Sequence, residues 1–263
     1  MSLLIEKVYS DLVASDGTVC VIYLASMNLG RLSHRYAGVQ LFLPDGRRLC
    51  ERTTATTDAW LCRPSREEIE IQLELDSGLL ALRYRVEIGD WQPPGEPPRK
   101  GLDWSVLMAR GTGTLTWRDG SRKLEGSGYV DRVRLDTAPR LLGIRQLDWG
   151  RIHLSQSTIV YTDLEFRDRS RWTWSACWPH GDGSPVVQPH LPNADLRLDA
   201  VRDLHCGPAM HAAPDPSLTE RLVSRLLVGP AYDQRRLSRA TSGEALQPST
   251  GWAVHETVRR TPV

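Results

Sequence analysis

Short runs in which apolar and polar residues alternate recur along most of this chain. Residues 68–75 alternate charged positions with isoleucine and leucine, and residues 80–88 repeat the pattern after the turn Ser77-Gly78. Alternation with a period of two places all the apolar side chains on one face of a β-strand. The two runs therefore predict a β-hairpin with one buried face.

The same reasoning predicts strands elsewhere. Residues 8–27 form an expected hairpin, with a turn at residues 14–17 and a buried strand at residues 19–24. Residues 93–98 and 179–193 are rich in proline and glycine and are predicted to be loops. The remaining predicted strands are residues 36–42, 104–109, 111–117, 152–154, 158–166, 172–176, 196–198 and 251–258.

One short helix is expected near the C-terminal end. Ser217 and Glu220 have the spacing of a capping box, a stripe of leucines follows, and Gly229-Pro230 ends the pattern. The frequent strands otherwise predict an all-β protein of antiparallel strands. Such chains close into barrels or sandwiches, and an eight-stranded barrel has room for one ligand.

Composition narrows the class of protein. A length of 263 residues suits one large β domain or two small ones, and a net charge of +1 gives no reason to expect a nucleic-acid partner. No apolar run is long enough to predict a membrane span. Five scattered cysteines and the absence of a signal-peptide pattern in residues 1–5 predict reduced thiols and a cytoplasmic location.

The segment at residues 124–151 holds the densest group of candidate functional residues. Tyr129 and Asp131 lie two residues apart, so their side chains share one face of a strand. Trp149 and Arg151 repeat this spacing further along. An acid among aromatic residues on one face of a sheet is either a reaction centre or a buried polar network that holds two strands together.

Asp131 is compatible with both of these roles. Protonation of an alkene carbon needs a carboxylic acid kept neutral by apolar surroundings, together with aromatic faces that stabilise the cation. Asp131 with Tyr129, Trp104 and Trp149 could supply both. Alternatively, Asp131 pairs with Arg132, Arg151 or a backbone amide and is structural. An arginine partner would lower the pKa of Asp131 and make it a poor acid.

The segment carries Gly126, Gly128, Tyr129, Asp131, Trp149, Gly150 and Arg151. In this it resembles the lipocalin-like family of hydroxyneurosporene synthase (carotenoid 1,2-hydratase), whose pattern is Gly-x-Gly-Tyr-x-Asp followed further on by Trp-x-Arg or Trp-Gly-Arg. Weaker likeness extends to most of the chain, including Tyr9, Tyr23 and the strand that contains Trp104.

The resemblance implies two tandem lipocalin-like β domains, which we place at residues 1–126 and 127–263, with a ligand cavity at or between them. The family includes carotenoid hydratases and, more distantly, lipocalin-like Diels–Alderases and other cyclases of natural-product pathways, which need no metal or organic cofactor. We therefore expect a cofactor-independent cyclase, isomerase or hydratase of specialised metabolism. Its substrate would be an apolar polyene, terpenoid or polyketide-type molecule, bound at the domain junction.

The expected acid or hydrogen-bond donor is Asp131, with Tyr129 beside it. The residues expected to bind the substrate are Trp104, Trp149, Arg151, Tyr23 and Trp117. A non-catalytic carrier of an apolar small molecule is the main alternative, because the fold suits it equally well. A β-sandwich that only mediates protein contacts is a third possibility and predicts no internal cavity. The sequence leaves the oligomeric state open.

A metal site is not expected. Cys177 and His180 have the Cys-x-x-His spacing of a zinc site, but the later candidates are irregularly spaced, so solvated loop histidines are the favoured interpretation. Those later candidates are His190, His205, Cys206 and His211. His255 and Glu256 lie on a predicted strand and should face opposite ways.

Overall fold

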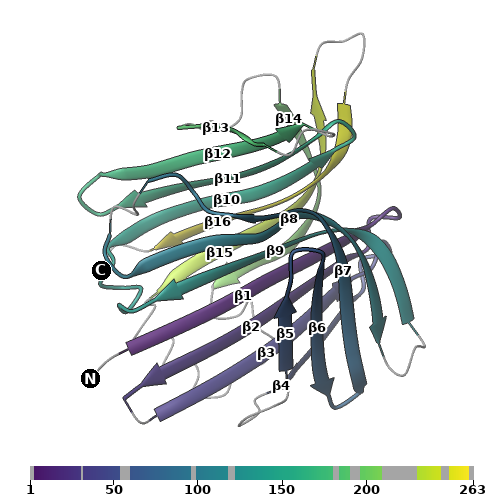
Figure 1. The fold of residues 1–263 in the computed structure, drawn as a ribbon, viewed down its shortest axis with the longest axis horizontal. Helices are drawn as coiled ribbons and strands as arrows, with labels where there is room; N and C mark the ends of the chain where they lie inside the picture. The colour runs from purple at the N-terminus through teal and green to yellow at the C-terminus, as the bar shows by residue number, and fades with distance from the viewer. Residues whose placement is uncertain are drawn as a thin grey trace. The chain divides into compact units, whose positions relative to one another are not determined.

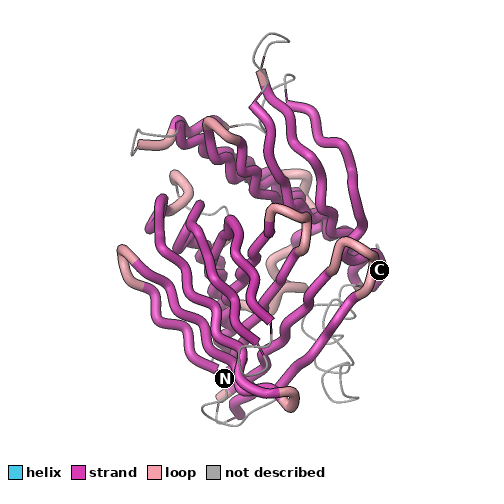
Figure 2. Tube along the Cα trace, turned by 90° about the vertical axis from the view of Figure 1, so that its right-hand side faces the viewer, coloured by secondary structure: helices cyan, strands magenta, loops and turns pink. Residues whose placement is uncertain are grey.

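A computed structural model describes residues 3–30, 32–53, 60–95, 99–117, 122–179, 184–189, 196–208, 230–243 and 249–260. Every regular element within these residues is a β-strand (Figure 2), which confirms the predicted all-β class. The helix predicted at residues 217–229 lies outside the described residues and stays a prediction.

The described strands form two antiparallel sheets. The first sheet has the order β4-β3-β2-β1-β9-β8-β7-β6-β5. Its strands are β1 (Leu3–Ala14), β2 (Val19–Leu29), β3 (Leu32–Phe42), β4 (Arg48–Thr53), β5 (Trp60–Pro64), β6 (Glu68–Leu75), β7 (Gly78–Trp91), β8 (Leu102–Trp117) and β9 (Arg122–Leu135).

The second sheet has the order β13-β12-β11-β10-β16-β15-β14. Its strands are β10 (Ile144–Leu154), β11 (Ser157–Phe166), β12 (Arg171–Pro179), β13 (Val186–Gln188), β14 (Leu196–Pro208), β15 (Ala231–Ser242) and β16 (Ser249–Arg260).

The chain divides into two compact units. The first contains Met1–Pro93 and Gly101–Thr137, and the second contains Pro94–Lys100 and Ala138–Val263. The boundary predicted between residues 126 and 127 falls within β9, whereas the two units divide after Thr137. Strand β9 pairs with β1 and β8 as far as Leu135, so its whole length belongs to the first unit.

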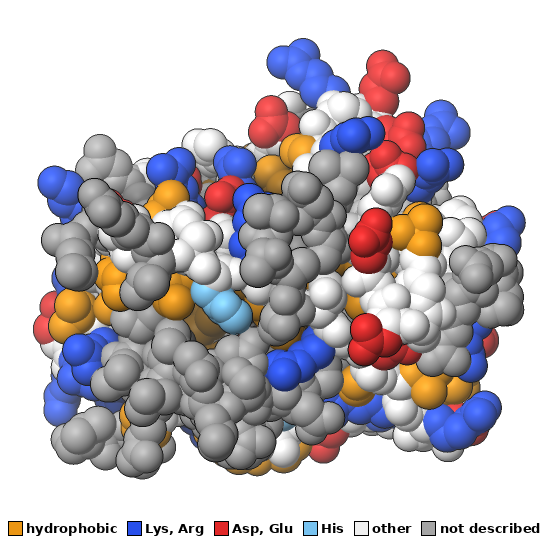
Figure 3. Space-filling view, turned by 90° about the horizontal axis from the view of Figure 1, so that it is seen from below, with side chains coloured by type: hydrophobic (Ala, Val, Ile, Leu, Met, Phe, Trp, Pro, Cys, Tyr) orange, Lys and Arg blue, Asp and Glu red, His pale blue; other side chains and the backbone are white. Residues whose placement is uncertain are grey.

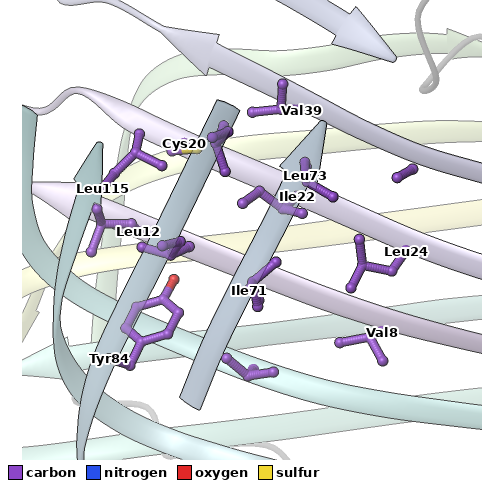
Figure 4. Close-up of a cluster of buried hydrophobic side chains, with 14 of the residues drawn as sticks. Val8, Leu12, Cys20, Ile22, Leu24, Val39, Ile71, Leu73, Tyr84 and Leu115 are labelled. Atoms are coloured by element: carbon purple, nitrogen blue, oxygen red, sulfur yellow. The ribbon is translucent and has the colours of Figure 1, made fainter. Parts of the chain in front are cut away.

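Alternate residues of the first sheet meet in one apolar cluster (Figure 4). Val8 of β1, Ile22 of β2, Val39 of β3, Ile71 of β6 and Leu115 of β8 all belong to it and are buried. Because strands from both ends of the sheet contribute, the sheet curls around this cluster, and Figure 1 shows β5–β7 crossing over β1–β3. Burial of this area from water is the main source of stability for the first unit.

Tyr84 of β7 lies within this cluster against two glycines. A Cβ atom added at Gly113 would lie 2.5 Å from the ring of Tyr84, and one at Gly128 would lie 2.2 Å from it. The Tyr84 hydroxyl donates a hydrogen bond to the carbonyl oxygen of Asp11 at 2.7 Å and lies 2.8 Å from the hydroxyl of Ser10. The ring therefore crosses β8 and β9 to reach β1, and only glycine leaves room for it.

The strongest sequence predictions are confirmed. The hairpins β1–β2 and β6–β7 are present. The strands predicted at residues 104–109 and 111–117 are one strand, β8, whose register with β9 shifts between Met108 and Gly111. The predicted loop at residues 179–193 contains the short strand β13.

Strand β15 has no counterpart among the predicted strands. Asp233 and Arg235 occupy buried positions on one of its faces, where the alternation rule expects apolar residues. Strands β4 and β5 were also not predicted, because each is too short to show a clear alternation.

The described surface carries mixed charge. In Figure 3, side chains of both signs are interspersed over the described part of the face, in keeping with the net charge of +1. Within the described residues there is no helix whose length and apolar character would let it cross a membrane.

Gly128→Ala should destabilise the first unit strongly. The new methyl group would meet the Tyr84 ring and also lie 2.7 Å from the carbonyl oxygen of Asp11, so backbone as well as side chain must move. We expect a loss of about 3 kcal/mol in the free energy of unfolding, measured by denaturant titration. Ser127→Ala, on the adjacent residue facing the other way, is the matched control. A loss below about 0.5 kcal/mol for Gly128→Ala would contradict this account of the glycine.

Candidate functional site

Two copies of the pattern Tyr-x-Asp lie side by side on β1 and β9. In the antiparallel register, Tyr9 pairs with Asp131 and Asp11 pairs with Tyr129. Within each strand the tyrosine hydroxyl donates to the carboxylate two residues later, from Tyr9 to Asp11 at 2.9 Å and from Tyr129 to Asp131 at 3.1 Å. All four side chains lie on the face of the sheet opposite the apolar cluster.

Asp131 accepts two side-chain hydrogen bonds at one oxygen atom. Its Oδ2 atom accepts hydrogen bonds from the Tyr129 hydroxyl and from the indole N–H of Trp104, the latter at 3.2 Å. Trp104 reaches it because β8 is the neighbour of β9. Asp131 is only 4% exposed, and Tyr129 and Trp104 are also buried.

Burial raises the pKa of the Asp131 carboxyl to about 7. The ionised form loses the hydration that it would have in water, and this loss is the largest effect. The positive charge of Lys7 and the two hydrogen bonds from Tyr129 and Trp104 act in the opposite direction, whereas the neighbouring Asp11 raises the pKa further. Near neutral pH, Asp131 can therefore exist as a carboxylic acid and donate a proton.

Tyr23 and Lys7 extend the same face. The Tyr23 ring lies 5.3 Å from the Tyr9 ring in an edge-to-face arrangement. The Lys7 Nζ atom lies over the Tyr23 ring, 4.5 Å from its centroid. The face around Asp131 therefore combines aromatic rings with one cation.

The structure brings together some of the residues predicted to form the site. Tyr129, Trp104 and Asp131 are in contact, and Tyr23 is linked to them through Tyr9. Trp117 lies elsewhere, in the apolar cluster on the opposite face, where its indole N–H donates to Ser77 at 3.0 Å.

Sequence reasoning did not select Tyr9 and Asp11 as site residues. The available signal was the Tyr-x-Asp pattern at residues 9–11, which places two residues of the same types on one face of a strand. The pattern alone did not indicate which strand would lie beside it.

Strand pairing places neither of the two arginines considered as partners beside Asp131. Arg151 cannot reach it by strand pairing, because β10 pairs with β11 and β16 in the second sheet. Arg132 points to the opposite face of β9, where its guanidinium lies 4.0 Å from Glu6. The cation that acts on Asp131 is Lys7.

The second unit has a polar layer of its own. Trp149 and Arg151 are buried on one face of β10, in the second sheet. On the same face, the Arg235 guanidinium donates to Glu256 at 2.6 Å and to Asp233 at 3.3 Å. Both carboxylates are thus ion-paired with one buried guanidinium.

His255 and Glu256 face opposite ways, as predicted. The His255 Nε2 atom lies 2.8 Å from the Ser238 hydroxyl, whereas Glu256 binds Arg235 on the other face. Within the described residues, no group of three or more His, Cys, Asp or Glu side chains could hold a metal ion. Of the zinc candidates, His180, His190 and His211 lie outside the described residues.

Comparison with known proteins places this geometry in a fold family. No protein-family model and no curated protein sequence matches the chain. The crystal structure of CghA does match, with a TM-score of 0.65, 11% identity, and coverage of 99% of this chain and 89% of CghA. The chain has the lipocalin-like fold. The resemblance seen in the sequence is thus confirmed at the level of the fold.

Two further solved structures share this fold. The AttH-type protein NE1406 of Nitrosomonas europaea matches with a TM-score of 0.59 and 13% identity over 98% of this chain and 92% of that protein. Kievitone hydratase from Nectria haematococca matches with a TM-score of 0.57 and 8% identity, over 98% of this chain and 89% of that protein. At these identities the likeness concerns the fold, and the chemistry must be argued from this chain's own residues.

The raised pKa of Asp131 makes the stability of the protein depend on pH. An aspartate in the unfolded chain ionises near pH 3.9, so between that pH and about 7 the folded state binds one more proton than the unfolded state. Stability therefore falls as pH rises through this window. Relative to Asp131→Asn, the wild type should gain about 3 kcal/mol in unfolding free energy between pH 8 and pH 5.

Denaturant titration of both proteins at each pH measures this difference. Asp103→Asn, which changes an exposed carboxylate on β8, is the control and should leave the pH profile of the wild type unchanged. The assignment of Asp131 as an acid is wrong if the difference in unfolding free energy between the wild type and Asp131→Asn is the same at pH 5 and pH 8. In that case Asp131 is ionised throughout this range.

Proposed function

We propose that this protein is a cofactor-independent enzyme acting on an apolar polyene, terpenoid or polyketide-type substrate. The reaction would be a cyclisation, isomerisation or hydration. The observation that carries the proposal is the buried Asp131 carboxyl, held by Tyr129 and Trp104 and with a pKa raised to about 7. Acid chemistry on carbon needs a neutral carboxyl of this kind.

The fold supports the same proposal. One protein that shares it is a hydratase by name, and another, CghA, has also been crystallised with Sch210972. The shared fold does not fix the substrate of this chain, because one fold hosts many activities.

The proposed step is proton transfer from Asp131 to an alkene carbon or a carbonyl oxygen of the substrate. Both hydrogen bonds to Asp131 use Oδ2, so the acid proton resides on Oδ1. The Asp131 O–H bond breaks, and the substrate gains the proton. The π faces of Tyr9, Tyr129 and Trp104 then stabilise the positive charge. Loss of a neighbouring proton, attack by water or internal cyclisation would complete the reaction, and proton uptake restores the acid.

A carrier of an apolar small molecule is the second candidate. The observation that favours it is that Tyr129 and Trp104 already donate to Asp131, so the carboxyl is also suited to a purely structural role beneath a bound ligand. In that case the bound molecule would leave the protein unchanged.

Native mass spectrometry followed by solvent extraction separates the two functions. An enzyme that uses Asp131 should carry or release product, whereas Asp131→Asn should retain unconverted substrate, with turnover reduced by about 10²- to 10⁴-fold. Because the acid must be protonated, wild-type turnover should fall about tenfold for each pH unit above 7.

Asp103→Asn is again the matched control and should process the substrate like the wild type. If the wild type and Asp131→Asn carry the same molecule in the same amount, the enzyme proposal fails and the carrier function is favoured.

A further inference from the structure

Lys7 has an unusual position for a lysine in this chain. It is one of only three lysines, against thirty arginines, and it lies near the middle of β1 on the face that carries Tyr9 and Asp131. Its side chain is half-buried, and its ammonium group rests on the Tyr23 ring at 4.5 Å. A half-buried ammonium group loses hydration, and the aromatic face replaces only part of that loss.

The nearby carboxylates are held by groups other than Lys7. Asp131 accepts from Tyr129 and Trp104, and Asp11 accepts from Tyr9. Among the described residues, no ion pair within 4.0 Å involves Lys7. Its positive charge therefore remains able to meet an anion that approaches this face.

An apolar strip adjoins Lys7 on the side away from Tyr9. In the register of β1 with its two neighbours, Ile5 lies between Met27 of β2 and Leu135 of β9. Lys7 itself lies between Ala25 and Val133. The side chains of this strip are half-buried, so they offer apolar contact area beside the cation. They are Leu3, Ile5, Met27, Leu29, Val133 and Leu135.

We propose that Lys7 selects ligands that combine an apolar body with one acidic head group, a carboxylate or an enolate. The head group would bind the Lys7 ammonium, and the body would lie along the apolar strip. Within the paired residues of β1 and β9 (5–14 and 126–135), the charged groups on this face are Lys7, Asp11 and Asp131, so in this pair of strands Lys7 is the group that matches a negative charge. The inference rests on the proposed function and names the substrate class of the same site.

This placement also orients the reaction. Lys7 pairs with Val133, and Tyr9, two residues on, pairs with Asp131, so the cation and the acid occupy adjacent rows of the sheet. A substrate anchored by its head group at Lys7 presents to Asp131 the atoms near that head group. Protonation would therefore occur close to the acidic end of the molecule.

The test compares two fluorescent polyene probes, cis-parinaric acid and its methyl ester. They share the apolar chain and differ in charge at about pH 8, where the acid is ionised. Fluorescence titration of the wild type should give about tenfold tighter binding of the acid. Lys7→Met keeps the apolar stem and should bind the two probes equally, whereas Lys7→Arg should restore the preference.

Arg132→Met is the matched control, because Arg132 lies beside Lys7 on the pair β1–β9 but faces the opposite way. It should keep the preference for the acid. The proposal is overturned if the wild type binds acid and ester equally, if the preference survives in Lys7→Met, or if the acid does not bind. The enzyme proposal fails on a different result, which is that the wild type and Asp131→Asn carry the same molecule in the same amount.

Discussion

The close approach of the Tyr84 ring to β8 and β9 is the constraint on which the first unit depends. Gly113 and Gly128 leave the space for the ring, and its hydroxyl reaches the backbone of β1. Because side chains alternate along a strand, glycine at positions 126 and 128 commits Tyr129 and Asp131 to the other face. One motif thus serves two purposes: Gly128 leaves room for the Tyr84 ring, and Tyr129 and Asp131 build the candidate site.

The chemistry of that site follows from a competition at Asp131. Lys7 and two hydrogen bonds favour the carboxylate, but the loss of hydration outweighs them and raises the pKa of Asp131 to about 7. In the second unit the opposite arrangement is found, since Arg235 binds Glu256 and Asp233 directly. Glu256 and Asp233 accept from a guanidinium, whereas Asp131 accepts from a phenol and an indole, and these surroundings suit Asp131 to proton donation.

Most of the strand pattern could be predicted from the sequence, because alternation reports directly on which face is buried. The hairpins β1–β2 and β6–β7 are clear examples. The prediction failed at β15, where Asp233 and Arg235 are buried as an ion pair. Charged residues at buried positions hide the alternation of apolar and polar residues that marks a strand. The prediction also assigned Trp117 to the site, because periodicity alone cannot tell which of two buried faces a tryptophan occupies.

The sequence by itself determined the all-β class, the main hairpins and the two faces of the central motif, because these depend on residues close together in the chain. Only the tertiary structure decided that β1 lies beside β9, which joins Tyr9 and Asp11 to Tyr129 and Asp131, and that β9 and β10 belong to different sheets. Strand pairing joins distant segments, and desolvation depends on everything packed around a group. Neither can be read from local spacing, so the partners and the pKa of Asp131 emerge only in the folded chain.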